Sequence, residues 1–276
     1  MATLPNPLPR LATDPSGRSL GLRLPPGTVP DLSDGATRRE PLLWQADAVT
    51  APGGWTALGA PAARVGLLPV LLDTGGTQGG PLTWDLTPER MSYPGDHDAG
   101  EVLEEHWGFD DPDEEPDDEL LEELLPFGPL WPGLAPAGAL TADPAEQASR
   151  TADELVSASS GWFREPHLAL VPARRSADIP AAIGWGGPLN HDNDVARLCA
   201  VLRSWEDRFG VRVVGLGFDI MTVSVAAPPA TLAEAEAVAA EHFAFCPDNV
   251  TQNGTGGLRG YAETLVGATS WSFWWD

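Results

Sequence analysis

Short apolar runs and alternating stretches predict several strands in the first half of the chain. Leu42–Trp44 and Val65–Leu72 are apolar runs bounded by turn residues, so each is expected to form a buried strand. Alternation at Leu20–Leu24 and a run at Leu82–Leu86 predict two further strands. Pro, Gly, Ser and Asp dominate the rest of residues 1–42, and any helix between the strands is expected to be short.

The pattern sharpens after residue 160, where it predicts a series of regular elements. A helix from about Asp194 to Phe209 carries apolar residues at three- and four-residue spacing and ends at Gly210. A capping-box spacing at Thr231–Glu234 begins a second helix that should reach about Phe245. The remaining elements are strands at His167–Val171, Val211–Leu216, Asp219–Val225 and Trp271–Trp275, and a short helix at Ser176–Ile183 with Ser176 as its cap.

The region between these halves is polar, and short separate helices are predicted in it. Helical turns are expected at Glu101–Trp107 and Glu119–Leu125, separated by Pro112 and Pro116, and a polar helix is expected at about Pro144–Ala158. This region connects the two parts of the chain and is expected to act as a tether.

The order of these elements predicts an α+β fold in three parts. The first part is Pro/Gly-rich and irregular with short strands, the second is acidic and helical, and the third is an α+β domain. In the third part we expect a small mixed β-sheet covered on one side by helices. The boundaries are placed at residues 1–95, 96–160 and 161–276.

The net charge of the chain limits the kinds of molecule that it is expected to bind. All 16 basic residues are Arg, against 40 Asp and Glu, which gives a net charge of −24. The stretch from Glu101 to Leu124 holds thirteen of the acidic residues and no Arg. Such a field repels phosphate backbones and anionic lipids, which argues against direct binding of nucleic acid or a membrane surface. The acidic charge is compatible with a basic protein partner. The acidic stretch itself could mimic nucleic acid, or it could be a solvated segment with no binding role.

The cysteine content and the apolar runs bear on location. Two cysteines, Cys199 and Cys246, are too few for a disulfide framework, and no signal-peptide pattern starts the chain. The longest apolar run, Val65–Leu72, is far shorter than the ~20 residues of a membrane helix. We therefore expect a cytoplasmic protein with no membrane span, and no motif predicts a cofactor.

Short motifs in the last hundred residues resemble a known family. They are Gly184-Trp185, Asn190-His191-Asp192-Asn193-Asp194, Leu202-Arg203-Ser204-Trp205-Glu206, Phe209-Gly210, His242-Phe243-Ala244-Phe245-Cys246-Pro247-Asp248, Tyr261-Ala262 and the Trp-rich end. From about His167 to Asp276 the chain is similar to the large bacterial family called domain of unknown function 4253. The resemblance implies a bacterial cytoplasmic protein and supplies no activity and no catalytic residue.

His242 and Cys246 form the first candidate for chemistry. Residues four apart share one helix face, where an imidazole and a thiolate can form a nucleophile–base pair or half of a metal site. The same face carries Leu232, Ala235 and Ala239, so both side chains are also explained by packing alone, which is the favoured interpretation. A zinc site would need two further ligands, and no metal site is expected.

A polar run before the helix that follows it is the second candidate. Asn190–Asp194 supplies one imidazole, two amides and two carboxylates, and capping of the helix accounts for Asn193 or Asp194. His191 is then the surplus polar group. It would approach His242 and Cys246 if the two helices pack together, or it is an exposed loop histidine.

Arginine and tryptophan side chains complete the candidates. Arg174 and Arg175 precede a helix start, where guanidinium groups and backbone amides can hold a carboxylate or phosphate, or can serve as surface ion-pair partners. Alternation in the last strand puts Trp274 on the face opposite Trp271, where it is a candidate contact residue. The candidate catalytic residues are Cys246, His242 and His191, and the candidate binding residues are Arg174, Arg175, Trp185, Asn190, His191, Asn193, Asp194 and Trp274.

Three functions stay open on the sequence. The acidity, the aromatic residues and the absence of a catalytic motif favour a cytoplasmic interaction or binding protein, with an accessory or immunity-type partner of a basic protein as one form. The alternatives are a hydrolase or transferase that uses Cys246 and His242, and a sensor that binds a small molecule or a metal.

Overall fold

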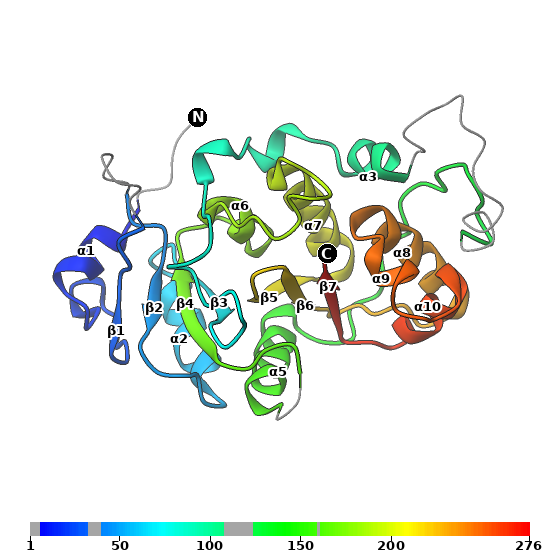
Figure 1. Ribbon diagram of the computed structural model, residues 1–276. Coiled ribbons are helices and arrows are strands. Elements are labelled where there is room, and N and C mark those ends of the chain that lie inside the picture. The colour runs from blue at the N-terminus through cyan, green and yellow to red at the C-terminus, as the bar shows by residue number, and fades with distance from the viewer. Residues whose placement is uncertain (1–5, 33–39, 108–123, 159–160) are drawn as a thin grey trace.

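A single mixed β-sheet organises the chain (Figure 1). The computed structural model describes residues 6–32, 40–107, 124–158 and 161–276. Within them the strand order is β1-β2-β4-β3-β5-β6-β7, and β3 pairs parallel with β5 while the other neighbours pair antiparallel. The strands are β1 (Gly27–Thr28), β2 (Trp44–Ala46), β3 (Leu68–Asp73), β4 (Pro166–Val171), β5 (Arg212–Leu216), β6 (Ile220–Ser224) and β7 (Ser270–Trp274).

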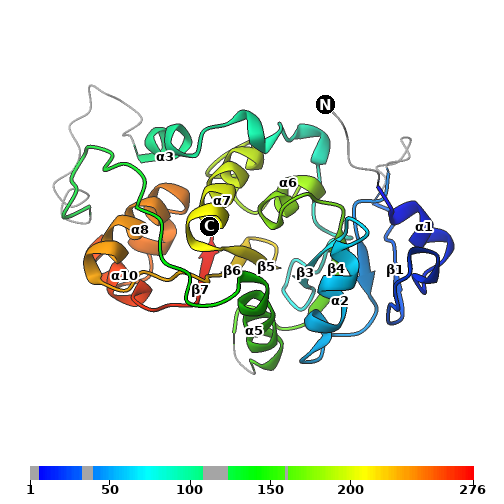
Figure 2. The ribbon, with the colours of Figure 1, turned by 180° about the vertical axis from the view of Figure 1, so that it is seen from behind.

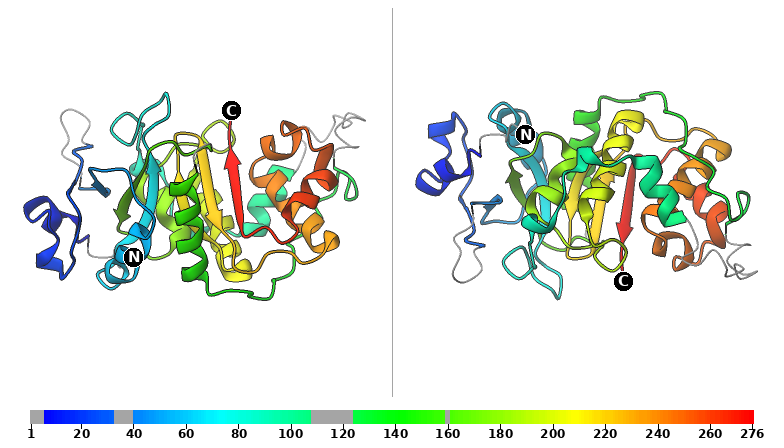
Figure 3. Two further views of the ribbon diagram at one scale, coloured as in Figure 1. Left: turned by 90° about the horizontal axis from the view of Figure 1, so that it is seen from below. Right: turned by 90° about the horizontal axis from the view of Figure 1, so that it is seen from above.

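Helices cover both faces of this sheet (Figures 2 and 3). One face carries α2 (Gly54–Ala63) and α5 (Pro144–Ser157), and the other carries α6 (Ile179–Ile183), α7 (Val195–Phe209) and α3 (Ala99–Trp107). Beyond β7 lie α8 (Leu232–Phe245), α9 (Asp248–Thr251) and α10 (Gly257–Leu265). The shorter helices are α1 (Leu8–Thr13), η1 (Arg18–Leu20), η2 (Pro88–Arg90), η3 (Pro94–Asp96) and η4 (Ser176–Asp178).

The central strands are apolar on both faces because each face meets a hydrophobic core. In β3, Leu71 packs into the core under α2 and α5, while Leu72 packs into the core under α6 and α7. In β4, Leu170 and Val171 divide between the same two cores. Two-sided burial therefore explains why these strands appear in the sequence as continuous apolar runs.

Capping residues define the ends of the two best-formed helices. Asp194 accepts a hydrogen bond from the Ala196 amide at the start of α7, and Gly210 ends it with a φ of 62°. Thr231 and Glu234 form a reciprocal capping box at the start of α8. These local signals are the ones that the sequence predicted, and both are confirmed.

Most predicted elements are confirmed, and four expectations are corrected. Leu20 is the last residue of the 3-10 turn η1, and residues 21–24 form no strand. Residues 82–86 form no strand either, because the amides of Thr83 and Trp84 bind the Gly80 carbonyl oxygen in a turn. The sheet is covered on both sides instead of one. Ser176 does not cap its helix, because its hydroxyl accepts the Val213 amide at 2.7 Å.

The three sequence parts are joined through the sheet. β3 belongs to residues 1–95 but lies between β4 and β5, which belong to residues 161–276. All three parts contribute to the hydrophobic cores, because Leu103 and Trp107 of the second part lie in one core and Ala148 and Ala152 lie in the other. Residues 108–123, which hold most of the acidic stretch, lie outside the described residues. None of the described helices is long and apolar enough to cross a bilayer.

Candidate functional site

Cys246 lies at the end of α8 and binds the edge of the sheet. Its Sγ donates to the carbonyl oxygen of Trp274 at 2.9 Å and lies 3.5 Å from Oδ1 of Asn249. The Nδ2 of Asn249 donates to the carbonyl oxygen of Ser272 at 2.7 Å. Since β7 is the last strand of the sheet, these two side chains satisfy carbonyl groups that lack a neighbouring strand.

His242 belongs to the same buried network. Its Nδ1 lies 3.0 Å from the hydroxyl of Tyr261, which also accepts Nδ2 of Asn249 at 3.2 Å. The rings of Trp205, Trp271 and Phe273 surround the imidazole, with centroids 4.5 to 5.0 Å away. Neither His242 nor Cys246 has exposed surface.

This environment opposes the ionised forms of both side chains. Burial lowers the pKa of His242 to about 3 and raises the pKa of Cys246 to about 12. At neutral pH the imidazole is therefore uncharged and the thiol is protonated. Tyr261 and Asn249 separate the two groups in the hydrogen-bond network, so no imidazole–thiol bond activates the sulfur.

His191 approaches α8 but does not join this network. Its Nε2 lies 3.0 Å from the carbonyl oxygen of Ala244, one of the last-turn carbonyls that have no partner within the helix. The neighbouring ring is His106, at a centroid distance of 4.4 Å. Burial, together with the nearby His106, lowers the pKa of His191. His191 thus caps the end of α8.

The other polar residues of the 190–194 run serve the local structure. Asp194 caps α7 and also accepts the Ser92 amide at 3.1 Å. Asn190 donates to the carbonyl oxygen of Asp276, while Asn193 is exposed. The run therefore holds a loop and two chain segments in place. Two of its members, His191 and Asp192, meet at His106: the two imidazole centroids lie 4.4 Å apart, and Asp192 Oδ2 lies 3.2 Å from His106 Nε2.

The two candidate tryptophans have different exposures. Trp185 is buried, and its Nε1 donates to the carbonyl oxygen of Gly217 at 2.8 Å. Trp274 is half-buried on the outer face of β7, with the exposed ring of Trp162 at 6.5 Å. The predicted alternation of the last strand is confirmed, because Trp271 and Phe273 face the core.

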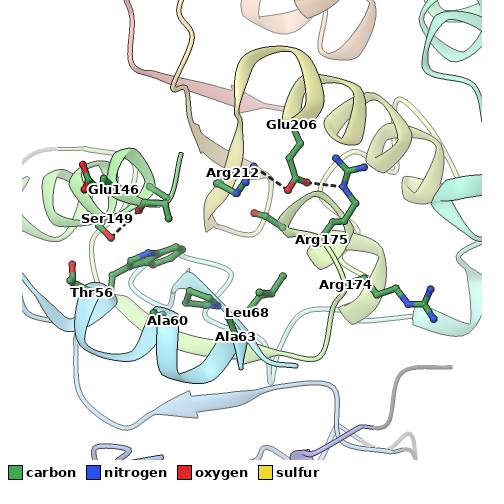
Figure 4. Close-up of a pocket in the computed structure, with 16 residues that line it drawn as sticks. Thr56, Ala60, Ala63, Leu68, Glu146, Ser149, Arg174, Arg175, Glu206 and Arg212 are labelled. Atoms are coloured by element: carbon green, nitrogen blue, oxygen red, sulfur yellow. Dashed lines mark hydrogen bonds and ion pairs between the residues drawn. The ribbon is translucent and has the colours of Figure 1, made fainter. Parts of the chain in front are cut away.

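A groove with a volume of about 600 Å³ lies on the face of the sheet that carries α2 and α5 (Figure 4). Small and apolar side chains from both helices and from β3 line most of it. They are Trp55, Gly59, Ala60, Ala63, Leu68, Pro69, Ala145 and Ala148. A cavity of this size with apolar walls is typical of small-molecule sites.

One end of the groove is charged. The guanidinium groups of Arg175 and Arg212 approach the carboxylate of Glu206 from opposite sides (Figure 4). The nitrogen–oxygen distances are 3.3 Å from Arg175 Nε and 3.0 Å from Arg212 Nη1. Burial alone would lower the pKa of Arg175, but its bonds to Asp207 and Glu206 outweigh this and raise it. Arg174 contributes to the lining, but its side chain points away from the groove (Figure 4).

Comparison with known proteins places the last part of the chain in a family. Residues 167–276 match the family model described as Domain of unknown function (DUF4253). The carboxy-terminal part of the chain is thus similar to this family, and we call residues 167–276 the DUF4253 region. This confirms the resemblance predicted from its motifs. No curated protein and no solved structure matched the chain.

The DUF4253 region contains the whole Cys246 network but only the charged end of the groove. Arg175, Glu206 and Arg212 belong to the region, whereas α2, β3 and α5 precede it. The groove therefore forms only where the DUF4253 region packs against the residues before it.

The DUF4253 region also holds a buried ion pair that was not predicted from the sequence. Glu241 has no exposed surface, and Arg208 forms two bonds to its carboxylate, at 2.7 and 2.6 Å. The Ala135 amide and Trp205 Nε1 complete its partners, at 2.6 and 2.7 Å. The sequence signal that could have indicated this buried carboxylate is the position of Glu241 directly after the alanines of α8. Among the described residues, no group of three or more His, Cys, Asp or Glu is placed to hold a metal ion.

Proposed function

We propose that this chain is a binding protein and that the groove between α2 and α5 is its ligand site. The supporting observation is the groove itself, which combines an apolar floor with the Arg175–Glu206–Arg212 cluster at one end. Sites for small molecules share this combination of apolar walls and a few fixed polar groups.

The geometry offers little support for a Cys246-dependent reaction. A nucleophilic thiol needs access, a lowered pKa and a base within hydrogen-bond reach. Cys246 is fully buried, its pKa is about 12, and its hydrogen bonds go to Trp274 and Asn249. We therefore assign the network a structural role at the edge of the sheet.

The neutral fluorescent probe N-phenyl-1-naphthylamine tests the proposal. We expect one saturable site in the wild-type chain, and loss of the site in Gly59→Leu and Ala145→Leu. A Cβ on Gly59 would lie 3.7 Å from Pro69 and 3.8 Å from Trp55, so the substitution fills the groove without a clash at the backbone. Leucine also favours a helix more than glycine does.

Ala233→Leu is the matched control, since Ala233 is exposed on α8 and does not line the groove. Equal probe binding by wild type, both groove variants and this control would refute the proposed site. Thermal unfolding of each variant establishes that it is folded.

A second candidate is recognition of a basic protein partner, such as an accessory or immunity-type complex. It is supported by the net charge of −24 and by exposed carboxylates near α3. These are Asp96, Asp98, Glu101, Glu104 and Glu105. A pull-down from native cells at moderate salt tests this second candidate. Recovery of no stoichiometric partner would refute it. For this function we propose a bacterial cytoplasmic setting, which the two free thiols support.

A further inference from the structure

Arg212 has an unused hydrogen-bonding edge at the groove. Its internal partners, the Val211 carbonyl oxygen at 2.7 Å and Glu206 Oε1 at 3.0 Å, are both bound by Nη1. Within the described part of the chain, its Nε and Nη2 have no partner. The Nε–Nη2 edge of a guanidinium is the fork that binds a carboxylate through two parallel hydrogen bonds.

Arg175, the neighbouring guanidinium, has no such free edge. Its Nε binds Glu206, its Nη1 and Nη2 bind Asp207, and its Nη2 also donates to the Arg203 carbonyl oxygen. Arg175 therefore orients Glu206, and Glu206 in turn holds Arg212 through its other oxygen. A guanidinium fixed in this way loses little conformational freedom when it binds a ligand.

The charges around the groove favour an anionic group over a cationic one. The Glu206 carboxylate is shared by two guanidinium groups and is mostly buried, so it is a poor partner for a further cation. The other lining carboxylate, Glu146, lies on α5 and is mostly exposed, and Arg150 pairs with it at 3.5 Å. Arg212 is thus the polar group best placed to select a ligand.

We propose that the ligand is a small amphipathic carboxylate, bound through the Nε–Nη2 edge of Arg212 with its apolar body on the α2–α5 walls. This inference rests on the proposed function of the groove and specifies its ligand class. Trp55, Ala60 and Ala63 on one wall and Ala145 and Ala148 on the other form the apolar surface. The field of a chain with net charge −24 repels anions, so binding depends on the short-range bonds of Arg212.

Competition against bound N-phenyl-1-naphthylamine tests this assignment with two probes that share an alkyl chain. Decanoate carries the carboxylate, and 1-decanol lacks it. We expect decanoate to displace the probe at a concentration about tenfold lower than 1-decanol, since two charge-assisted hydrogen bonds distinguish them. Both are used below the concentrations at which they aggregate, at fixed ionic strength.

Substitution of Arg212 then gives the decisive comparison. Arg212→Met should bring the two probes to equal potency, Arg212→Lys should retain part of the preference, and Arg259→Met should retain all of it. Arg259 lies on α10, is mostly exposed and matches the change in charge. If Arg212→Met fails to fold, Arg212→Gln replaces it.

The outcomes separate this inference from the proposed function. Equal potency of the two probes in the wild type, or a preference that survives in Arg212→Met, overturns the carboxylate assignment and leaves the groove as a ligand site. Failure of the neutral probe to bind in the groove overturns the proposed function and this inference together.

Discussion

The Cys246 thiol donates a hydrogen bond to the carbonyl oxygen of Trp274, across 2.9 Å, and so joins the end of α8 to the last strand of the sheet. A thiol, which is the nucleophile in many enzymes, thus acts here as a structural hydrogen-bond donor. Asn249 does the same for Ser272, so the exposed edge of β7 is protected by two side chains from one helical region.

Both thiols are expected to be unreactive in the folded protein. Cys199 and Cys246 have no exposed surface, and burial raises the pKa of both, that of Cys246 to about 12. Titration with a disulfide reagent at mildly alkaline pH should find no reactive thiol in the native protein and two in guanidinium chloride. A fast-reacting Cys246 in the native state would contradict the structural role and favour the enzyme hypothesis.

Asn249→Ala is expected to destabilise the fold. The substitution leaves the Ser272 carbonyl oxygen without its donor and removes one bond to Tyr261, at a cost of about 1 to 3 kcal/mol in the free energy of unfolding. Urea denaturation measures the change. Gln252→Ala, an exposed substitution nearby, should change the free energy by about 0.5 kcal/mol or less. Equal effects of the two substitutions would show that the edge bonds contribute nothing.

Stability should fall with decreasing pH through His242. Burial lowers the pKa of its folded form from 6.5 to about 3, so between these values the unfolded chain binds a proton that the folded chain excludes. The contribution of His242 to the free energy of unfolding is complete above pH 6.5. It decreases by up to about 1.4 kcal/mol for each pH unit as the pH falls from 6.5 toward 3.

His242→Phe tests this assignment, because phenylalanine is compatible with the surrounding rings of Trp205, Trp271 and Phe273. Urea denaturation at several pH values should show a shallower dependence in the variant. An unchanged dependence would mean that other groups cause the loss of stability in acid.

The Arg208–Glu241 pair should be far more sensitive than a surface pair. Glu241→Gln leaves the Arg208 guanidinium without a counter-ion and places an amide nitrogen, which cannot accept, opposite two of the four N–H donors, at an expected cost of about 3 to 5 kcal/mol. Arg150→Gln breaks the exposed Arg150–Glu146 pair and should cost about 0.5 kcal/mol or less. Chemical denaturation compares the two, and similar costs would contradict the structural importance of the buried pair.

The predictions from sequence succeeded where the signal was local. The apolar stripe of α7, the capping box of α8 and the strands β5 and β6 each depend on residues close together in the chain, and all are confirmed. The helix α2 was expected only as a short helix, if one formed at all, and its bounds were not predicted, because Gly54, Gly59 and Pro61 interrupt its pattern. Its contacts with β3 and α5 stabilise it all the same.

The roles of the arginines at the charged end of the groove could not be predicted from the sequence. Arg175 was a candidate, but its hydrogen-bonding capacity is already used within the protein. Arg212 was not a candidate, because a single arginine at the start of a strand has no distinctive pattern. Its position beside α2 and α5 follows from strand order, which depends on contacts between distant parts of the chain.

The affinity of N-phenyl-1-naphthylamine for the wild-type chain and for Gly59→Leu is the most direct measurement of the central claim, that the groove binds a ligand. The account predicts one saturable site in the wild type and an affinity at least about tenfold lower in the variant, with the folded state retained, because the added side chain occupies the groove. Equal affinities in the two folded proteins, or no saturable binding to the wild type, would contradict it.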